Sequence, residues 1–272
     1  MGKRLRTVVT AALALAAVVL GVPATASAAA PTRVGYDVSY PQCGSSLPSA
    51  RAFAIVGVNG GLSTRANPCL ATQLAWAWRS NGSVPSQPKA QLYLNTANPG
   101  EVRDQVSTWP TTGSTPYGAC DGGNSMACSW EYGWERASNS ILSFFTPAAR
   151  AARVDGRPAS YVWWLDVETT NTWQSGSTEA LARNRATLEG MTGYVIARGG
   201  RVGLYSTGQQ WAQIVGNVPP GSNLAGRANW LAGSTSLADA SSDCSNPALV
   251  PGGRVTLTQY VVGGLDRNNA CG

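Results

Sequence analysis

The sequence predicts an α/β protein that folds as a single TIM-like barrel of alternating strands and helices. Eight short segments have the apolar pattern of strands, and helical segments separate most of the early ones. Residues 29–272 have about the length of one such barrel, which typically takes about 250 residues. Because neither an internal repeat nor a Pro-rich linker divides this stretch, we expect one domain over residues 29–272.

The first residues are expected to be a signal peptide spanning residues 1–28. Lys3, Arg4 and Arg6 form a basic start, an uncharged apolar run follows over residues 8–20, and Ala26-Ser27-Ala28 resembles a cleavage site. The apolar run is short for a membrane span, which needs about 20 residues. The sequence therefore predicts a secreted, extracellular protein that has no membrane association after cleavage.

The remaining chain divides into the expected strands and helices in order. The expected strands are residues 33–39, 52–58, 90–95, 161–168, 201–205, 228–232, 254–260 and 265–266. The expected helices are residues 70–78, 130–154 and 178–198, with a further helix ending near Gly216. Residues 96–128 are rich in Gly, Ser, Thr and Pro, and we expect a long inserted loop there. Loops of that length in compact domains usually serve function.

Composition excludes several kinds of chemistry. The chain has no His, so a Ser-His-Asp triad, a His-ligated zinc ion and an imidazole proton shuttle are excluded. We expect neither a metal nor another cofactor. Half of the net charge of +6 comes from the leader, and the other arginines are scattered singly rather than in a basic stripe, so no nucleic-acid partner is expected. We expect the protein to act as a monomer.

Six cysteines in an exported chain predict three disulfides. Fifteen connectivities are possible for six cysteines. We favour pairing between neighbours, because each bridge would then close a local loop: Cys43 with Cys69, Cys120 with Cys128, and Cys244 with Cys271. A free nucleophilic thiol is the competing interpretation, and the even number of cysteines and the absence of His argue against it.

The residues most informative about chemistry are Asp166 and Glu168, at the end of the expected strand 161–168. Side chains alternate along a strand, so both carboxyl groups face the same side, about 6.6 Å apart at 3.3 Å per residue. Two acids this close behind an apolar strand cannot both ionise freely. One should keep its proton near neutral pH, as the general acid of glycosidic bond cleavage must.

Asp37 and Asp266 are expected to join this pair. Asp37 ends the first strand, on the face opposite Tyr36 and Val38, and Asp266 follows the last strand. A barrel closes by pairing its first strand with its last, so closure would bring the two acids together near Asp166 and Glu168. Taken singly, each acid has a plainer interpretation as a turn or cap residue.

Four uncharged residues at strand ends are candidates for substrate binding. The Tyr205 hydroxyl could hydrogen-bond a sugar, and Asn59 and Asn95, which end the second and third strands, could bind sugar hydroxyls. Trp173 follows the acidic strand closely, and its ring could stack on an apolar sugar face. Each of the four could instead serve packing or strand termination.

The sequence resembles glycoside hydrolase family 25, the lysozymes that cleave the muramic acid–glucosamine linkage of peptidoglycan. The resemblance begins at Gly35-Tyr36-Asp37-Val38-Ser39 and covers nearly all of residues 29–272. It continues through Phe53-Ala54-Ile55-Val56, Leu165-Asp166-Val167-Glu168, Gly203-Leu204-Tyr205-Ser206, Trp230-Leu231-Ala232, Gln259-Tyr260 and Leu265-Asp266-Arg267-Asn268. The resemblance implies a barrel of five β/α units and three terminal strands, acting on peptidoglycan or a related amino-sugar glycan.

The resemblance also implies roles for the four acids. Glu168 would be the proton donor, and Asp166 would orient the substrate's acetamido group or stabilise the cation formed from the sugar. Asp37 and Asp266 would complete an acidic floor. The sequence departs from the family at the rim, where Gly57 and Gly60 replace the usual Lys and Glu, Leu94-Asn95 the usual His-Phe, and Thr258 the usual Trp.

Two other functions remain open. One is a catalytically idle barrel that binds cell-wall glycan without cleaving it. The other is a chitinase-like glycosidase, which would carry a longer run of alternating acids. Val162 and Trp164 occupy the preceding inward positions of this strand, which argues against the chitinase.

Overall fold

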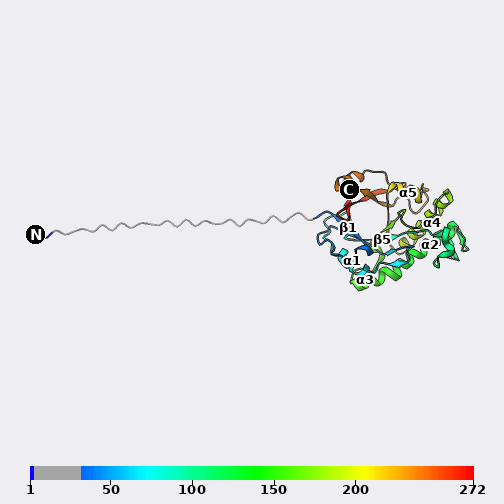
Figure 1. Ribbon diagram of the computed structural model, residues 1–272, viewed down its shortest axis with the longest axis horizontal. Coiled ribbons are helices and arrows are strands. Elements are labelled where there is room, and N and C mark those ends of the chain that lie inside the picture. The colour runs from blue at the N-terminus through cyan, green and yellow to red at the C-terminus, as the bar shows by residue number, and fades with distance from the viewer. Residues whose placement is uncertain (3–31) are drawn as a thin grey trace. The chain divides into compact units, whose positions relative to one another are not determined.

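The protein folds as a closed barrel of eight strands, as predicted (Figure 1). This computed structural model describes residues 1–2 and 32–272, so the predicted leader and cleavage site lie outside the described residues apart from the first two. Around the barrel the order is β1-β12-β11-β10-β9-β8-β5-β2. The barrel strands are β1 (Gly35–Val38), β2 (Ala54–Gly57), β5 (Ala90–Asn95), β8 (Val162–Asp166), β9 (Arg201–Ser206), β10 (Ala228–Ser234), β11 (Arg254–Val262) and β12 (Leu265–Ala270).

The last strand, β12, runs antiparallel to both of its neighbours, β1 and β11, whereas the other seven pair in parallel. Parallel strands need crossover connections. Within residues 32–272, five of these crossovers are α-helical, which matches the predicted number of β/α units. The first follows β2 rather than β1, because the chain from β1 to β2 contains only a 3-10 turn (Tyr40–Gln42) and irregular loop.

Helices surround the barrel and bury the outward side chains of its strands. They are α1 (Leu70–Trp78), α2 (Met126–Asn139), α3 (Thr146–Ala152), α4 (Thr178–Ala197), α5 (Gly208–Ile214) and α6 (Leu237–Asp243). The predicted helix 130–154 is α2 and α3 joined by a π-helical segment (Ser140–Phe145). Pro147 is tolerated because it lies in the first turn of α3, where its missing N–H breaks no bond.

Large aromatic side chains fill the barrel interior. Trp164, Tyr205 and Trp230 pack there with Phe53, Ile55 and Leu257. Glycine on a neighbouring strand makes room for the largest of them, because a Cβ on Gly203 would lie 2.3 Å from the Trp164 ring. The interior is therefore a packed core rather than a channel, and polar groups gather only at its end.

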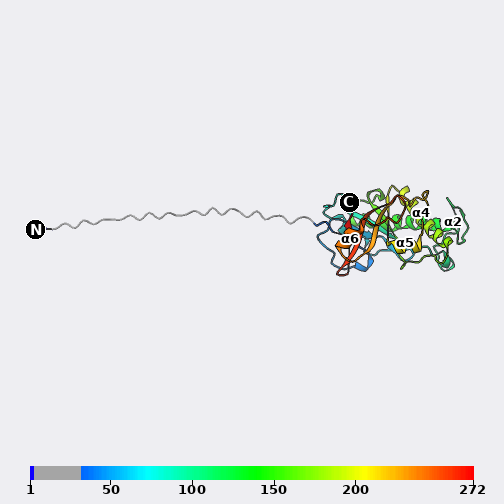
Figure 2. The same ribbon diagram turned by 90° about the horizontal axis from the view of Figure 1, so that it is seen from above.

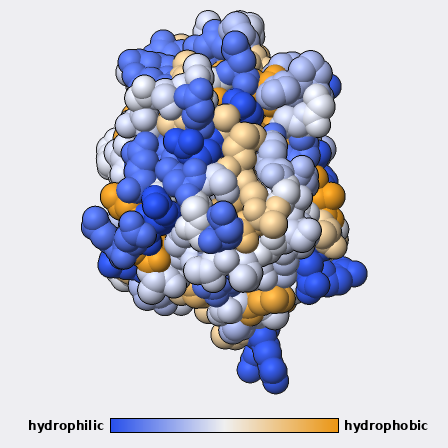
Figure 3. All heavy atoms as spheres, turned by 90° about the vertical axis from the view of Figure 1, so that its right-hand side faces the viewer, coloured by the Kyte–Doolittle hydropathy of each residue, from blue (hydrophilic) through white to orange (hydrophobic). Residues whose placement is uncertain are grey.

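Helices α2 and α4 lie side by side on one flank of the barrel (Figures 1 and 2). Glycine at the contact lets the two helices approach closely. A Cβ on Gly133 would lie 1.9 Å from the Thr187 carbonyl oxygen, and a Cβ on Gly190 would lie 2.0 Å from the Trp130 carbonyl oxygen. Seen from this flank, the surface is mainly hydrophilic or neutral, with small separate apolar spots (Figure 3). The apolar sides of the two helices therefore face inward.

Residues 96–128 were expected to form a long loop, but they carry structure of their own. They include a 3-10 helix (Gly100–Gln105), a hairpin of β6 (Gly113–Thr115) and β7 (Gly118–Cys120), and the start of α2. Trp109 stacks on Tyr132 with ring centroids 5.5 Å apart, and both belong to a small separate core. Hydrophobic periodicity does not predict these elements, because each is shorter than the window in which periodicity can be recognised.

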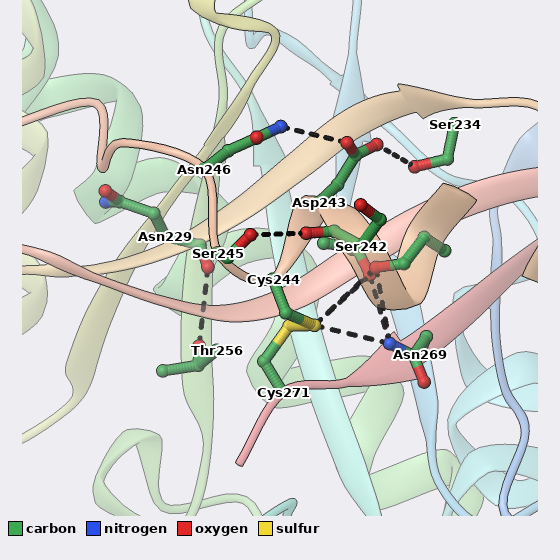
Figure 4. The surroundings of a disulfide bond; sticks show 12 residues. Asn229, Ser234, Ser242, Asp243, Cys244, Ser245, Asn246, Thr256, Asn269 and Cys271 are labelled. Atoms are coloured by element: carbon green, nitrogen blue, oxygen red, sulfur yellow. Dashed lines mark hydrogen bonds between the residues drawn. A yellow bond between two sulfur atoms is a disulfide. The ribbon is translucent and has the colours of Figure 1, made fainter. Parts of the chain in front are cut away.

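The three disulfides join neighbouring cysteines, as predicted: Cys43–Cys69, Cys120–Cys128 and Cys244–Cys271. The last of them ties the residue after β12 to the end of α6 (Figure 4). Beside it, Asn269 donates to the Cys244 sulfur at 3.4 Å, and Thr258 donates to the Ala240 carbonyl at 2.7 Å. Separately, among the described residues no helix combines the length and the apolar character that crossing a membrane requires.

Candidate active site

Four carboxyl groups meet at the C-terminal ends of the parallel strands. Asp37 comes from β1, Asp166 ends β8, Glu168 lies two residues beyond β8, and Asp266 is the second residue of β12. All four line a cavity of about 270 Å³ at the end of the packed core, and all four also line a wider cleft of about 660 Å³ that continues from it. The structure thus brings together the four acids singled out in the sequence.

Asp266 reaches this end of the barrel by a different route from the one expected. The sequence suggested that it follows the last strand, but it stands near the start of β12. Because β12 runs antiparallel to β1 and β11, its first residues lie at the C-terminal ends of the parallel strands. The reversal of one strand therefore delivers the fourth acid to the cavity.

Glu168 keeps the inward direction of β8 although the strand itself ends at Asp166. The backbone N–H of Val167 donates to the Tyr205 carbonyl at 2.9 Å, which continues the pairing with β9 past the strand's end. The Glu168 carbonyl accepts from the Asn171 backbone N–H at 3.1 Å and from the Trp173 indole at 2.9 Å. These bonds fix the main chain at the point where the glutamate enters the cavity.

Burial and mutual repulsion hold protons on this pair. Asp166 is buried, and desolvation followed by the nearby Glu168 charge raises its pKa well above the ordinary value. Desolvation also raises the pKa of the half-buried Glu168, while a hydrogen bond from Asp166 opposes that rise. Among the described residues, Asp166 Oδ1 has no hydrogen-bond partner.

Asp37 is held by two side-chain amides. Gln259 Nε2 lies 3.1 Å from each carboxyl oxygen, and Asn268 Nδ2 donates at 2.7 Å. Even so, desolvation and the charge of Asp266 raise the pKa of Asp37 to about 7, because these outweigh the amide hydrogen bonds. Asp37 is therefore a buried carboxyl whose charge changes near neutral pH.

The uncharged candidates divide between the cavity and its supports. Tyr205 lines the inner cavity, where its hydroxyl donates to Gln259 Oε1 at 2.8 Å. Asn59 and Asn95 line the wider cleft, but they also bond each other, the Asn95 backbone N–H donating to Asn59 Oδ1 at 2.7 Å. Trp173 packs against the outer core and lines neither cavity among the described residues. The structure places it as a support for Glu168.

Three residues that line the cavities or hold Asp37 were not predicted as site residues. Tyr93 lines both cavities, and burial raises the pKa of its hydroxyl well above the ordinary value. Gln259 and Asn268 appeared only within short motifs, although their inward positions two residues from Leu257 and Asp266 follow from strand alternation. Extending that alternation along every strand would have found all three.

The chemistry available at this site is proton transfer between carboxyl groups. Among the described residues, no three Cys, Asp or Glu side chains are placed to hold a metal ion together. The cavity does offer two adjacent acids with raised pKa values, a tyrosine hydroxyl and fixed amide donors. Such a set can protonate one oxygen of a ligand while a second carboxylate supports charge nearby.

No family model matches the sequence, and no curated protein matches it. Among solved structures, the chain is similar to a muramidase from Trichobolus zukalii, with a TM-score of 0.48 and 17% sequence identity. The alignment covers 89% of this chain and 94% of that chain.

Proposed function

We propose that this protein is a glycoside hydrolase that cleaves an amino-sugar polymer, with peptidoglycan as its substrate, in the manner of family 25 lysozymes. The observation that carries the proposal is the meeting of Asp37, Asp166, Glu168 and Asp266 in one cavity at the C-terminal end of a closed barrel. That end is where barrel enzymes place their active sites. The wider cleft of about 660 Å³ gives a polymer access to the acids.

In the proposed reaction, Glu168 donates a proton to the glycosidic oxygen. Glu168 is half-buried and lines both cavities, so it can reach a bound sugar, whereas Asp166 is almost fully covered. The pKa of Asp166 is raised the more strongly, so in this reaction Asp166 holds the proton of the pair and passes it to Glu168. This single transfer prepares the general acid and leaves a carboxylate on Asp166 at the same time.

The carboxylate left on Asp166 then assists departure of the leaving group. It can accept a hydrogen bond from the substrate's acetamido N–H and so direct the acetamido oxygen toward the anomeric carbon, or stabilise an oxocarbenium-like cation. Asp37 and Asp266 keep the electrostatic potential of the cavity negative, which favours the developing positive charge.

We also propose that the protein is secreted. Three disulfides that close local loops are stable in an oxidising compartment and rare in a reducing one. The basic, then apolar, leader of the sequence supports the same location. Detection of the protein in culture medium with Ala29 as its first residue tests this proposal, and retention in the cell with residues 1–28 intact contradicts it.

The decisive test is mass spectrometry of the products from purified peptidoglycan. Wild-type protein should release muropeptides, and Glu168→Gln should lower kcat by about 10² to 10⁴-fold, because an amide cannot donate the proton. Glu179→Gln, which changes an exposed glutamate at the start of α4, is the matched control and should leave kcat unchanged. Binding without products from either protein would identify a glycan-binding barrel, and release of chitin oligomers alone would identify a chitinase.

A further inference from the structure

One side chain in the wider cleft carries the charge opposite to that of the acids. Arg65 is the only lysine or arginine that lines this cleft among residues 32–272. It is exposed, and within the same residues no ion pair includes it. A cleft with four carboxyl groups at its inner end and one unpaired guanidinium at its rim has a strong internal polarity.

Arg65 stands on a short hairpin whose backbone is fixed from several sides. The hairpin consists of β3 (Asn59–Gly60) and β4 (Arg65–Ala66). Its turn is held from outside, because Asn95 Nδ2 donates to the Gly61 carbonyl at 2.7 Å and the Tyr132 hydroxyl donates to the Leu62 carbonyl at 2.6 Å. The position from which the arginine projects is therefore set before any ligand binds, which lowers the entropic cost of binding.

An exposed aromatic ring lies beside this hairpin. Tyr40, in the 3-10 turn after β1, is 60% exposed and lines the same cleft. Its ring lies over Gly60, with the nearest ring atom 3.7 Å from the position of an added Cβ. An exposed ring at a cleft rim offers an apolar face on which a pyranose ring can stack. The Tyr40 ring and the Arg65 side chain therefore lie at the same end of the cleft, because Gly60 pairs with Arg65 in the hairpin.

We propose that Tyr40 and Arg65 form a subsite for an acidic sugar unit. The pyranose ring stacks on Tyr40, and a carboxylate carried by that unit pairs with the Arg65 guanidinium. The subsite rests on the proposed function and narrows its substrate to polymers whose sugars bear carboxylates, in preference to neutral polymers such as chitin. A guanidinium and a carboxylate form charge-assisted, often bidentate, hydrogen bonds, which uncharged sugar substituents cannot form.

The polarity of the cleft explains why such a subsite is needed. An anionic polymer approaching four carboxyl groups is repelled by any of them that is ionised. The Arg65 cation at the rim offsets this repulsion and holds the carboxylate of the substrate away from Asp37 and Asp166. The uncharged part of the sugar is then left to face the acids, which is the orientation that protonation of a glycosidic oxygen requires.

Cosedimentation with three forms of one insoluble polymer tests the subsite. The first is native peptidoglycan, the second has its carboxylates converted to neutral amides, and the third has its stem peptides removed, which frees the lactyl carboxylates that the stems had held in amide bonds. The Glu168→Gln protein is used so that binding is measured without digestion, with wild type assayed for products in parallel. Arg65→Ala and Arg65→Lys are compared with Arg201→Ala. Arg201 is an exposed arginine at the start of β9, at the end of the barrel away from the four acids.

The subsite predicts a preference that depends on Arg65. The protein should bind native polymer about tenfold more tightly than amidated polymer, as expected for one charge-assisted pair. Arg65→Ala should abolish the preference, Arg65→Lys should retain part of it, and Arg201→Ala should retain all of it. Equal binding of the native and amidated polymers, or a preference that survives in Arg65→Ala, would overturn the proposal.

The stem-free polymer identifies the source of the carboxylate. If the stem-free polymer binds more tightly than the amidated polymer, a free lactyl carboxylate can pair with Arg65, and if it binds no more tightly, the carboxylate that pairs belongs to the stem peptide. Tyr40→Ala should weaken binding to all three forms about fivefold, whereas Tyr40→Phe should not, because stacking needs the ring alone. Product release by wild type without any charge preference would refute the subsite only, and a preference without product release would refute the hydrolase only.

Discussion

Gln259 donates to both carboxyl oxygens of Asp37 from a single amide nitrogen, at 3.1 Å each. The other end of the same amide accepts the Tyr205 hydroxyl proton at 2.8 Å. An ionised carboxylate can only accept, so Asp37 requires the Nε2 end of the amide, and the Oε1 end is left to accept from Tyr205. Tyr205 therefore restrains Gln259 in the orientation in which Nε2 faces the buried acid.

Tyr205→Phe should raise the pKa of Asp37 above its value of about 7. Without the hydroxyl, the Gln259 side chain loses the bond that restrains it, which weakens its two contacts with Asp37, and those contacts favour ionisation. NMR titration of the Asp37 carboxyl carbon measures the shift. Tyr161→Phe is the control, because that hydroxyl donates to the Asp155 carbonyl outside the site. A pKa that is equal in the two variants would show that Tyr205 does not orient the amide.

The buried Asp37 should make the protein less stable as the pH rises. The folded-state pKa of about 7 exceeds the ordinary 3.8, so the folded protein holds the proton more tightly than the unfolded chain does. The stabilisation is present below about pH 4 and is lost as the pH rises toward 7. Asp37→Asn should therefore gain on the order of 10 °C in Tm relative to wild type between pH 4 and pH 7. Parallel Tm curves in calorimetry would contradict the expectation.

Asp166→Asn should shift the basic limb of the kcat/KM profile to lower pH. The wild-type pair keeps its proton with the strongly raised pKa of Asp166, whereas the amide holds no transferable proton and leaves Glu168 to titrate alone at a lower pH. We expect kcat to fall by about 10²-fold or more as well, because the assisting carboxylate is lost. Asp104→Asn changes an exposed acid and serves as the control. An unmoved basic limb would mean that the two carboxyls do not share a proton.

Two glycines of α4 should respond oppositely to alanine. A Cβ on Gly190 would lie 2.0 Å from the Trp130 carbonyl oxygen, so Gly190→Ala should cost about 2 kcal/mol or more in the free energy of unfolding. A Cβ on Gly193 meets only ring atoms of Trp134 and Trp130, at 3.4 Å or more. Gly193→Ala should therefore be neutral or gain up to about 1 kcal/mol through helix propensity. Urea unfolding of the two variants checks the contrast, which equal losses would refute.

Loss of the disulfide beside β12 should cost more stability than loss of the one in the insertion. Cys244 and Cys271 are 27 residues apart, and Cys120 and Cys128 are 8 apart. Loop-closure entropy then gives about 3.5 kcal/mol for the first bridge and about 2.5 kcal/mol for the second. Double Cys→Ser variants followed by thermal unfolding measure both. The reverse order would indicate that strain or residual structure outweighs loop length.

The arrangement of the barrel follows from sequence because its signals are local. Alternation along β8 placed Trp164 and Asp166 on one face, and both do lie on the inside of the barrel. Continuous apolar runs identified the buried strands, and Gly199-Gly200 marked the end of α4. Each of these features depends on residues a few positions apart, which periodicity detects well.

The remaining features depend on partners distant in sequence. The direction of β12 is set by pairing with β1 and β11, so the position of Asp266 relative to the strand end could not be derived locally. The bond between Gln259 and Asp37 joins residues 222 positions apart. Trp173 looked like a ligand-stacking residue by its place in the chain, but its contacts are with the outer core.

The pairing of β1 with β12 also affects how the protein is made. Asp37 and Asp266 come from the first and last strands of the barrel, which must find each other across almost the whole domain. No partly synthesised or partly translocated chain that lacks β12 can have a complete acidic cavity. Any activity that needs all four acids can therefore begin only after the final strand has been made and has paired with the first.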